Sequence, residues 1–234
     1  MDLTISVAGL NVGMEYTHRY VWGQCRQFLT DDTPDFSVSS TPEDWEREIE
    51  IAEDNVRLCD AEFTCLHREI AKRLPDYDAF LMHGAAMEAQ GKGYLFTAPS
   101  GTGKTTHIRM WMERYPETVR CINGDKPIVR KIDGQFCFCG TPWRGKEGYG
   151  EPLIVPVGGI CVLERAKDNF IRKVAPADVF QQLSHQIFFQ NEPRTLTKFL
   201  ALFDEFLSSV PVYRMGCNMD ISAAEMSFVA MTGV

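Results

Sequence analysis

The 234-residue sequence lacks any long apolar run. No stretch approaches the roughly 20 apolar residues that a membrane-spanning helix requires. The first residues, Met1-Asp2-Leu3-Thr4, also lack the cationic and apolar regions of a secretion signal. Internal repeats, low-complexity segments and long linkers are missing as well. We therefore expect a cytoplasmic protein with no membrane partner, built as one large domain or two small ones.

Positive charge is also scarce. Lysine and arginine total 24 against 32 aspartate and glutamate residues, which gives a formal net charge of -8. A protein that binds nucleic acid without sequence preference needs a basic stripe to displace counterions from the phosphates. The composition therefore argues against a nucleic acid partner, whereas a hydrophobic content of 44% is sufficient for a sizeable core.

None of the eight cysteines belongs to a Cys-x-x-Cys pair. Structural zinc sites need four clustered ligands, and disulfide frameworks are typical of small secreted chains. We interpret these cysteines as reduced and mostly buried thiols. Cys137 and Cys139 stand two residues apart in an apolar stretch, so on a strand they would share one face. A metal site at this pair is the less favoured alternative.

Local patterns predict the elements of the first eighty residues. Alternating apolar and polar residues predict strands at 3–7 and 35–38. Thr41-Pro42-Glu43-Asp44 combines an N-cap, a proline and two acids, which predicts the start of a helix. An apolar stripe predicts a second helix over 61–74.

From residue 80 the pattern changes to short apolar runs separated by glycine. A tight turn at Gly91-Lys92-Gly93 predicts a hairpin of two strands, 85–89 and 94–97, and helical spacing follows from Lys104 to Tyr115. Further strands are expected at 128–129, 136–138 and 160–163, and closing helices at 180–189 and 199–207.

Residues 98–105 form a Walker A pattern of the type AxxxxGKT, with alanine where the stricter pattern begins with glycine. Its glycines let the backbone wrap an anion, so that amide groups and the following helix N-terminus point at phosphates. Lys104 is expected to reach the β and γ phosphates of ATP, and Thr105 to present its hydroxyl to Mg²⁺. The alternative is a degenerate nucleotide site with only a structural role. The predicted ATP-binding residues are Ser100, Gly101, Thr102, Gly103, Lys104, Thr105 and Thr106.

Two short motifs flank this loop: Met82-His83-Gly84 before the hairpin and Ile122-Asn123-Gly124-Asp125 after the helix. Together with the loop they resemble the HPr kinase/phosphorylase family. The sequence SGTGKTT at residues 100–106 resembles that of the related ATP-dependent phosphoenolpyruvate carboxykinases. The similarity covers residues 80 to about 165. Residues 1–79 do not resemble the N-terminal domain of the HPr enzyme, which indicates a distinct subfamily.

The resemblance implies an α/β fold with a P-loop core of the HPr kinase / PEP carboxykinase type. Such a core has a mixed sheet, a β-hairpin leading into the phosphate loop and flanking helices. We expect residues 1–79 to form an N-terminal α/β accessory region packed on the core, and residues 80–234 to form the P-loop kinase core.

The resemblance also suggests roles for His83 and Asp125. His83 would lie beside the phosphates and either touch the metal or orient the nucleophile, although a lone histidine is more often structural. Both families place two adjacent acids where this sequence has Asp125 between Gly124 and Lys126. Asp125 would hold magnesium together with Thr105, accept the proton of an attacking hydroxyl, or do both in turn. The alternative is a loop aspartate that caps a turn.

The glycine-punctuated segment 140–148 carries Arg144 and Lys146 next to Trp143. It could close over the nucleotide, with either cation stabilising the charge on the transferring phosphoryl group. The alternative is a solvated basic loop, and Trp143 is interpreted either as a substrate stack or as a packing anchor. Three other polar residues are assigned no role in catalysis. Lys92 and His107 are expected at the surface, and Arg165 is expected either to contact the nucleotide or to pair with Glu164.

The leading hypothesis is an ATP- and Mg²⁺-dependent kinase that transfers the γ phosphate in line to a hydroxyl acceptor. The acceptor would be a serine or threonine of a protein or peptide, or a small hydroxylated metabolite. The resemblance also allows the reverse, phosphate-dependent dephosphorylation, and an assembly of identical chains is compatible with the sequence. The expected catalytic residues are His83, Lys104, Asp125, Arg144 and Lys146.

Two other functions remain open at this point. Carboxykinase-type decarboxylation would need further basic residues and a longer chain than 234 residues. A non-catalytic nucleotide-binding regulatory module would have no need of the full set formed by Lys104, Thr105 and Asp125.

Overall fold

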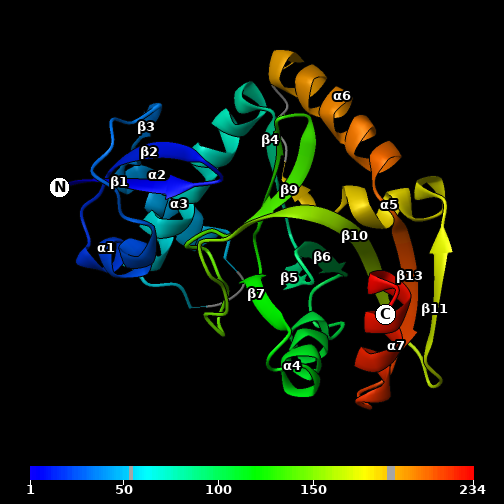
Figure 1. The fold of residues 1–234 in the computed structure, drawn as a ribbon. Helices are drawn as coiled ribbons and strands as arrows, with labels where there is room; N and C mark the ends of the chain where they lie inside the picture. Colours follow the sequence, from blue (N-terminus) through cyan, green and yellow to red (C-terminus); the bar gives the residue numbers. More distant parts are fainter. Residues whose placement is uncertain (53–54, 189–192) are drawn as a thin grey trace.

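The computed structural model describes residues 1–52, 55–188 and 193–234. An N-terminal three-stranded sheet with three helices lies on one side, and a ten-stranded mixed sheet with four helices makes up the rest of the described chain (Figure 1). The α/β class and the mixed sheet predicted from the sequence are confirmed. The N-terminal elements are β1 (Asp2–Val7), β2 (Leu10–Glu15), α1 (Arg19–Cys25), β3 (Phe36–Val38), α2 (Pro42–Glu50) and α3 (Leu58–Arg73).

The helix starts and packing of this region follow from its sequence. At the start of α2 the Thr41 side chain accepts from the backbone N–H of Asp44, whose carboxylate accepts from the N–H of Thr41 in return. On α3, Glu62 is buried and its carboxylate accepts from the backbone N–H groups of Thr17 and His18 and from the His18 ring. These bonds hold the start of α1 against α3.

The large sheet has the order β12-β4-β8-β9-β10-β6-β5-β7, and β13 joins it by pairing with β10 and β11. β10 is parallel to β6 and to β13, whereas the other pairs are antiparallel. The strands are β4 (Ala79–Met82), β5 (Ala85–Ala89), β6 (Lys92–Thr97), β7 (Val119–Asn123), β8 (Ile128–Ile132), β9 (Gln135–Cys139), β10 (Ile154–Arg165), β11 (Phe170–Val174), β12 (Ile187–Phe188) and β13 (Val212–Cys217).

Strand β10 connects the two halves of this sheet. One half consists of β12, β4, β8 and β9, and the other of β6, β5 and β7 together with β13 and β11. Its first residues pair with β9, and its later residues pair with β6 and β13. The register shifts between Val157 and Gly159, and a Cβ on Gly158 would lie 2.6 Å from the Tyr94 ring. Glycine is therefore required where the strand bends from one half to the other.

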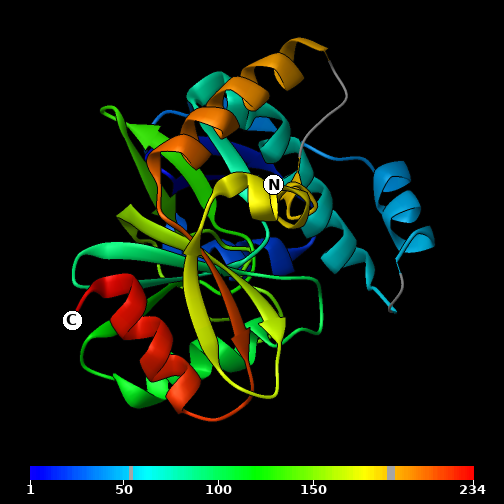
Figure 2. The ribbon, with the colours of Figure 1, turned by 90° about the vertical axis from the view of Figure 1, so that its right-hand side faces the viewer.

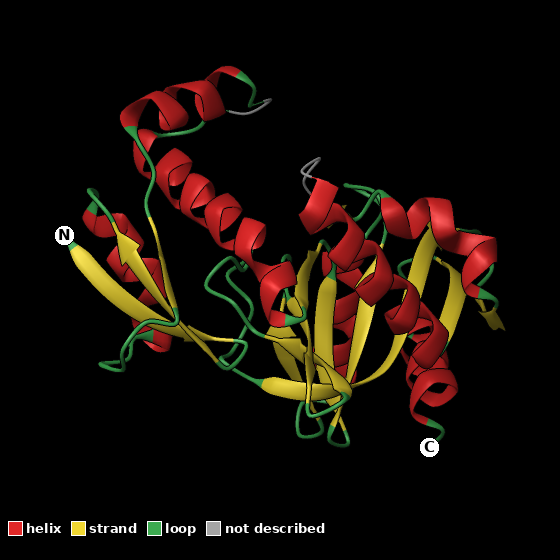
Figure 3. Ribbon diagram, turned by 90° about the horizontal axis from the view of Figure 1, so that it is seen from above, coloured by secondary structure: helices red, strands yellow, loops and turns green. Residues whose placement is uncertain are grey.

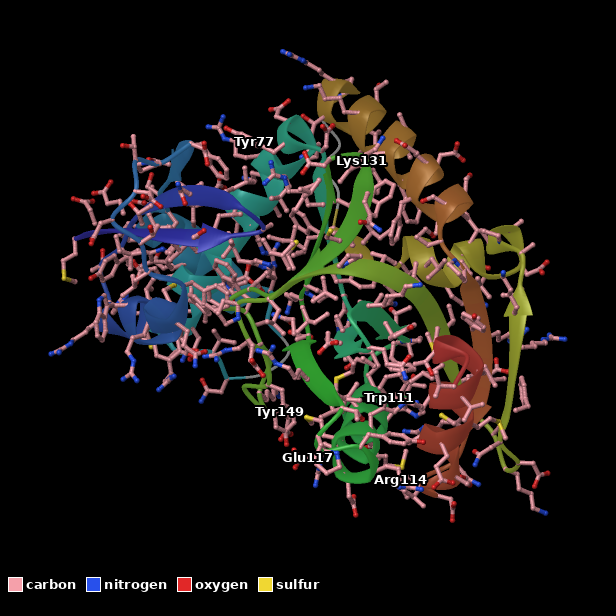
Figure 4. All side chains as sticks on the ribbon, in the orientation of Figure 1. Tyr77, Trp111, Arg114, Glu117, Lys131 and Tyr149 are labelled. Carbon is pink, nitrogen blue, oxygen red and sulfur yellow. The ribbon has the colours of Figure 1, made fainter. Side chains whose placement is uncertain are left out.

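Helices cover the two halves separately, as Figure 2 shows. Phe203 and Phe206 of α6 pack on Phe80 of β4, and Lys131 of β8 pairs with Glu205 of α6. On the other half Trp111 of α4 packs on Phe96 of β6 and on Phe228 of α7. Arg114 extends from α4 to Glu225 of α7 (Figure 4). The helices are α4 (Lys104–Arg114), α5 (Phe180–Ser184), α6 (Pro193–Ser209) and α7 (Ser222–Thr232).

The N-terminal elements and the large sheet share one hydrophobic cluster. It joins side chains of β1 and α3, such as Ile5 and Leu66, to side chains of β8 and β9, such as Ile128 and Cys139. Arg130 of β8 adds hydrogen bonds to the carbonyl oxygens of Ala8 and Tyr77. Figure 3 shows α3 running from α2 toward the strands of the large sheet.

Two local predictions are wrong. The helix expected over 180–189 ends at Ser184. Residues 187–188 form β12 instead, because they pair with Leu81 and Met82 of β4. Phe189, the last residue of the expected helix, lies outside the described residues. His107 is buried and not at the surface, because α7 covers it and Ser227 Oγ lies 2.9 Å from its Nε2. Lys92 is exposed, as predicted.

The cysteine prediction is confirmed. All eight are free thiols, and Cys137 and Cys139 belong to one hydrophobic cluster on one face of β9 while Phe136 and Phe138 belong to another. Of the helices in the part of the chain that the structure describes, none combines the length and apolar character needed to cross a bilayer.

Candidate active site

An open cleft of about 770 Å³ lies where the two halves of the large sheet meet the N-terminal elements. Four core segments line it: the loop between β6 and α4, the link between β4 and β5, the turn between β7 and β8, and the loop from 140 to 150. Residues of α1 and α3 form the remaining wall. Most of the residues predicted to act therefore meet in one place.

The loop from Ala98 to Gly103 follows β6 and leads directly into α4, as the sequence predicts. Gly101 and Gly103 have φ of +75° and +120°, values that disfavour other residues, and a Cβ on either would meet no atom within 4 Å. The loop therefore presents open backbone to the cleft. Six of the seven predicted ATP-binding residues line the cleft, and the exception is Thr102.

Lys104 is the first residue of α4 and is buried at the base of this loop. Its ammonium donates to the carbonyl oxygen of Ala98 at 2.8 Å. The pKa of Lys104 is lowered, mainly by burial. The charge of Asp125 opposes this lowering, and the charge of Lys126 adds to it. Arg165, at the end of β10, donates to the carbonyl oxygen of Gly101 and so supports the loop from behind.

His83 and Asp125 lie in two neighbouring connections that run between the halves of the large sheet. His83 links β4 to β5, Asp125 links β7 to β8, and the N–H of Gly84 donates to the carbonyl oxygen of Asp125 at 2.9 Å. His83 Nε2 lies 3.3 Å from Asp125 Oδ1. Burial works to raise the pKa of Asp125, but the hydrogen bond from His83 and the charge of Lys126 outweigh it and hold this pKa below its usual range. The carboxylate is therefore ionised at neutral pH.

A buried clamp fixes the backbone of the turn that carries Asp125. The side-chain oxygen of Asn123 accepts from the backbone N–H groups of Asp125 and Lys126, at 2.8 Å and 2.7 Å. Its amide nitrogen donates to Thr141, and the Thr141 hydroxyl donates to the carbonyl oxygen of Lys126. Asn123 and Thr141 are both fully buried. The turn is thus held in one geometry before any ligand binds.

Lys126 is a site residue to which sequence reasoning assigned no role. Its ammonium donates to Asp125 Oδ2 at 2.7 Å, and its side chain lines the cleft. The two oxygens of Asp125 are therefore engaged by different partners, His83 and Lys126. The sequence signal that could have identified Lys126 is its position, as a basic residue directly after the predicted acid Asp125.

The loop from 140 to 150 is anchored to α3 by Trp143. The indole stacks on Phe63 at 4.8 Å and on His67 at 4.6 Å between ring centroids, and its Nε1 donates to the carbonyl oxygen of Phe63. Gly145 then passes so close to Asp125 that a Cβ at this position would lie 3.0 Å from that of Asp125. Of the two interpretations of Trp143, the structure supports the packing anchor.

The two predicted cations of this loop occupy different environments. The Arg144 guanidinium donates to Gln27 at 2.8 Å, and so joins the loop to the 3-10 turn Arg26–Phe28 that follows α1. Lys146 is exposed, and both residues line the cleft. Tyr149 follows at the edge of the loop, beside β7 (Figure 4).

The N-terminal wall of the cleft consists of residues that the sequence did not single out. They combine ring faces with neutral and acidic polar groups: Tyr20, Gln24, Asp60, Phe63 and Thr64. Tyr20 packs edge to face on Phe63, and the Arg57 guanidinium lies over the Tyr20 ring while it bonds Asp60 through two nitrogens. Burial and a hydrogen bond to Asp60 raise the pKa of Tyr20.

The donor chemistry of the cleft suits a nucleotide with magnesium. Among residues 1–52, 55–188 and 193–234, no group of three or more His, Cys, Asp or Glu side chains converges on a metal position. Magnesium is commonly held by one or two carboxylates together with substrate phosphates and water. The hydroxyl of Thr105 and the carboxylate of Asp125, both in the cleft, are hard oxygen donors of this kind.

Fold and site together define an α/β protein with a mixed sheet and a polar cleft, in which a glycine loop, two lysines and a His–Asp pair meet. No protein-family model matches the chain, and no curated protein matches it. Among solved structures, the HPr(Ser) kinase/phosphatase from Coxiella burnetii aligns over 55% of this chain and 97% of its own, with 11% identity and a TM-score of 0.31. A TM-score of this size does not establish a common fold.

Proposed function

We propose that this chain is an ATP- and Mg²⁺-dependent kinase that transfers the γ phosphate to a hydroxyl group. One observation carries the proposal: Lys104, at the end of an open glycine loop, shares a cleft with Asp125, a carboxylate that is ionised and fixed in place. Phosphoryl transfer requires mainly positioning and charge neutralisation, and the cleft combines both.

Each residue has a distinct task in this proposal. The backbone of the loop from Ala98 to Gly103 surrounds the phosphates, and Lys104 exchanges the Ala98 carbonyl oxygen for a phosphate oxygen. Thr105 and Asp125 would hold magnesium, which when bound neutralises charge on the β and γ phosphates. The carboxylate of Asp125 also serves as proton acceptor for the attacking hydroxyl, and His83 fixes its orientation through Oδ1.

We propose further that the acceptor binds along the N-terminal wall. Tyr20 and Thr64 present hydroxyl groups there and Gln24 an amide, whereas Lys104 and Lys126 lie on the phosphate side. Such a wall suits a hydroxyl-bearing acceptor that is held by hydrogen bonds and ring contacts. Incubation with γ-labelled ATP and a fractionated lysate distinguishes a macromolecular acceptor from a small one.

The test of the nucleotide site is calorimetric titration with MgADP and MgATP. Lys104→Ala is expected to weaken binding of MgATP at least about 100-fold, because a charge-assisted phosphate contact in a buried position is lost. Lys92→Ala is the matched control, since Lys92 is exposed at the start of β6, outside the cleft. If Lys104→Ala binds and transfers phosphate as the parent does, the kinase proposal is wrong.

A further inference from the structure

Asp125 lies among basic side chains, and one of them, Lys126, is so far without a task. Lys126 Nζ lies 2.7 Å from Asp125 Oδ2, while His83 holds Oδ1. The charges of Asp125 and Lys126 both act on Lys104, so these three groups are electrostatically coupled across the cleft. The described lining of the cleft holds three carboxylates, of Asp60, Asp125 and Glu147, and that of Asp125 is thus neutralised locally by its own partners before a nucleotide arrives.

The placement of Lys126 is set by the backbone and not by its own side chain. Its N–H donates to Asn123, and its carbonyl oxygen accepts from Thr141. Both peptide groups of Lys126 are thus fixed, while its side chain is 40% exposed and lines the cleft. A partly exposed ion pair of this kind contributes little to stability. Stability alone therefore does not account for a lysine at this position.

We propose that Lys126 is a catalytic residue whose ammonium moves from Asp125 Oδ2 to the phosphoryl group during transfer. This inference rests on the proposed kinase function. As the acceptor oxygen forms its bond to the γ phosphorus, the bond from that phosphorus to the β–γ bridging oxygen breaks, and its electron pair leaves with ADP. Lys126 neutralises charge on the equatorial oxygens, and the released Oδ2 of Asp125 takes the hydroxyl proton.

This role makes a specific demand on binding. Negative charge spreads over the equatorial oxygens in the transition state, and one preorganised donor there is commonly worth about 10²- to 10³-fold in rate. Lys104 and the glycine loop bind the nucleotide in the ground state as well. Removal of the Lys126 charge should therefore weaken a transition-state mimic strongly and MgADP very little.

The experiment measures binding of MgADP alone and of MgADP with aluminium fluoride, a mimic of the transferring phosphoryl group that needs no known acceptor. We expect Lys126→Met to bind MgADP within about threefold of the parent and to lose about 100-fold in affinity for MgADP with aluminium fluoride. Lys126→Arg keeps the charge and should retain most of this affinity. Lys92→Met, outside the cleft, should match the parent in both titrations.

The outcomes separate this inference from the proposed function. If Lys126→Met and the parent bind both probes equally, Lys126 is not catalytic while the nucleotide site stands. The same conclusion follows if aluminium fluoride adds nothing to the affinity of the parent, or if Lys126→Met loses MgADP affinity to the same degree. If the parent binds no MgADP, the kinase proposal and this inference both fail. Lys126→Gln replaces Lys126→Met if thermal melting shows that the methionine variant does not fold.

Discussion

At the scale of single residues, the site is surrounded by buried polar groups, of which His67 is the clearest case. It is buried against Trp143, and its Nε2 has no hydrogen-bond partner in the described structure. Burial, helped by the charge of Lys126 and opposed by that of Asp125, lowers its pKa to about 3. The folded chain therefore keeps this ring neutral.

The sign of the resulting pH dependence follows from this depressed pKa. In the unfolded chain His67 takes up a proton near pH 6.5, whereas the folded chain resists protonation down to about pH 3. Its contribution to stability is thus complete above pH 6.5 and declines as the pH falls through this window. Between pH 7.5 and 5 the loss amounts to about 2 kcal/mol, because the slope approaches about 1.4 kcal/mol for each pH unit below pH 6.5.

We therefore predict that His67→Phe reduces the acid sensitivity of the protein. Phenylalanine keeps the ring stack on Trp143 but cannot be protonated. The free energy of unfolding, measured by urea titration at pH 7.5 and pH 5, should fall by about 2 kcal/mol less in this variant than in the parent. His185→Gln is the control, because His185 is exposed. Equal losses in parent and His67→Phe would contradict the prediction.

At the scale of elements, local signals in the sequence predicted several structures that are closed locally, although the β1–β2 hairpin was missed because β2 was not predicted. The capped start of α2 and the β5–β6 hairpin depend on residues within a few positions of each other, and both were predicted, although the hairpin turn lies at Gln90-Gly91 and Lys92 and Gly93 belong to β6. Helix α1 has no side-chain cap, and the two residues just before it, Thr17 and His18, are held by Glu62 on α3. Strand β12 similarly exists because β4 pairs with it. Such elements depend on distant partners and leave no local pattern.

The same distinction applies to the candidate site. The loop around Gly101 and Gly103 was predictable because its spacing is itself the signal. The wall residues Tyr20 and Thr64 were not, because only the packing of α1 and α3 against the loop from 140 to 150 brings them to the cleft. Residue spacing does not encode that packing.

The turn between β7 and β8 provides a prediction at this scale. Asn123→Ala removes the acceptor for two backbone N–H groups and the donor to Thr141, so we expect a loss of at least about 2 kcal/mol in the free energy of unfolding. Thr141→Val breaks only the hydroxyl bonds and should cost less. An Asn123→Ala protein as stable as its parent would show that the turn holds its geometry without the clamp.

At the scale of the whole molecule, the shared hydrophobic cluster predicts cooperative behaviour. Residues 80–234 alone would expose side chains that the N-terminal elements cover, including Leu81, Ile128 and Trp143. We expect the full chain to unfold in one transition, and the isolated segment to lack the near-ultraviolet circular dichroism of a packed core. Co-expression with residues 1–79 as a separate chain should restore it. Two separate transitions, or an isolated segment that binds MgADP, would refute this expectation.

The wall contributed by α1 and α3 has a consequence for how such a protein diversifies. In the proposed function, phosphate chemistry depends on one set of cleft residues, from His83 to Lys126, whereas the opposite wall is formed by Tyr20, Gln24 and Thr64. If this proposal holds, substitutions in the first eighty residues would alter the choice of substrate without disturbing the reaction itself. Descendants of one ancestral chain would then keep the same chemistry while exchanging the molecule on which it is performed.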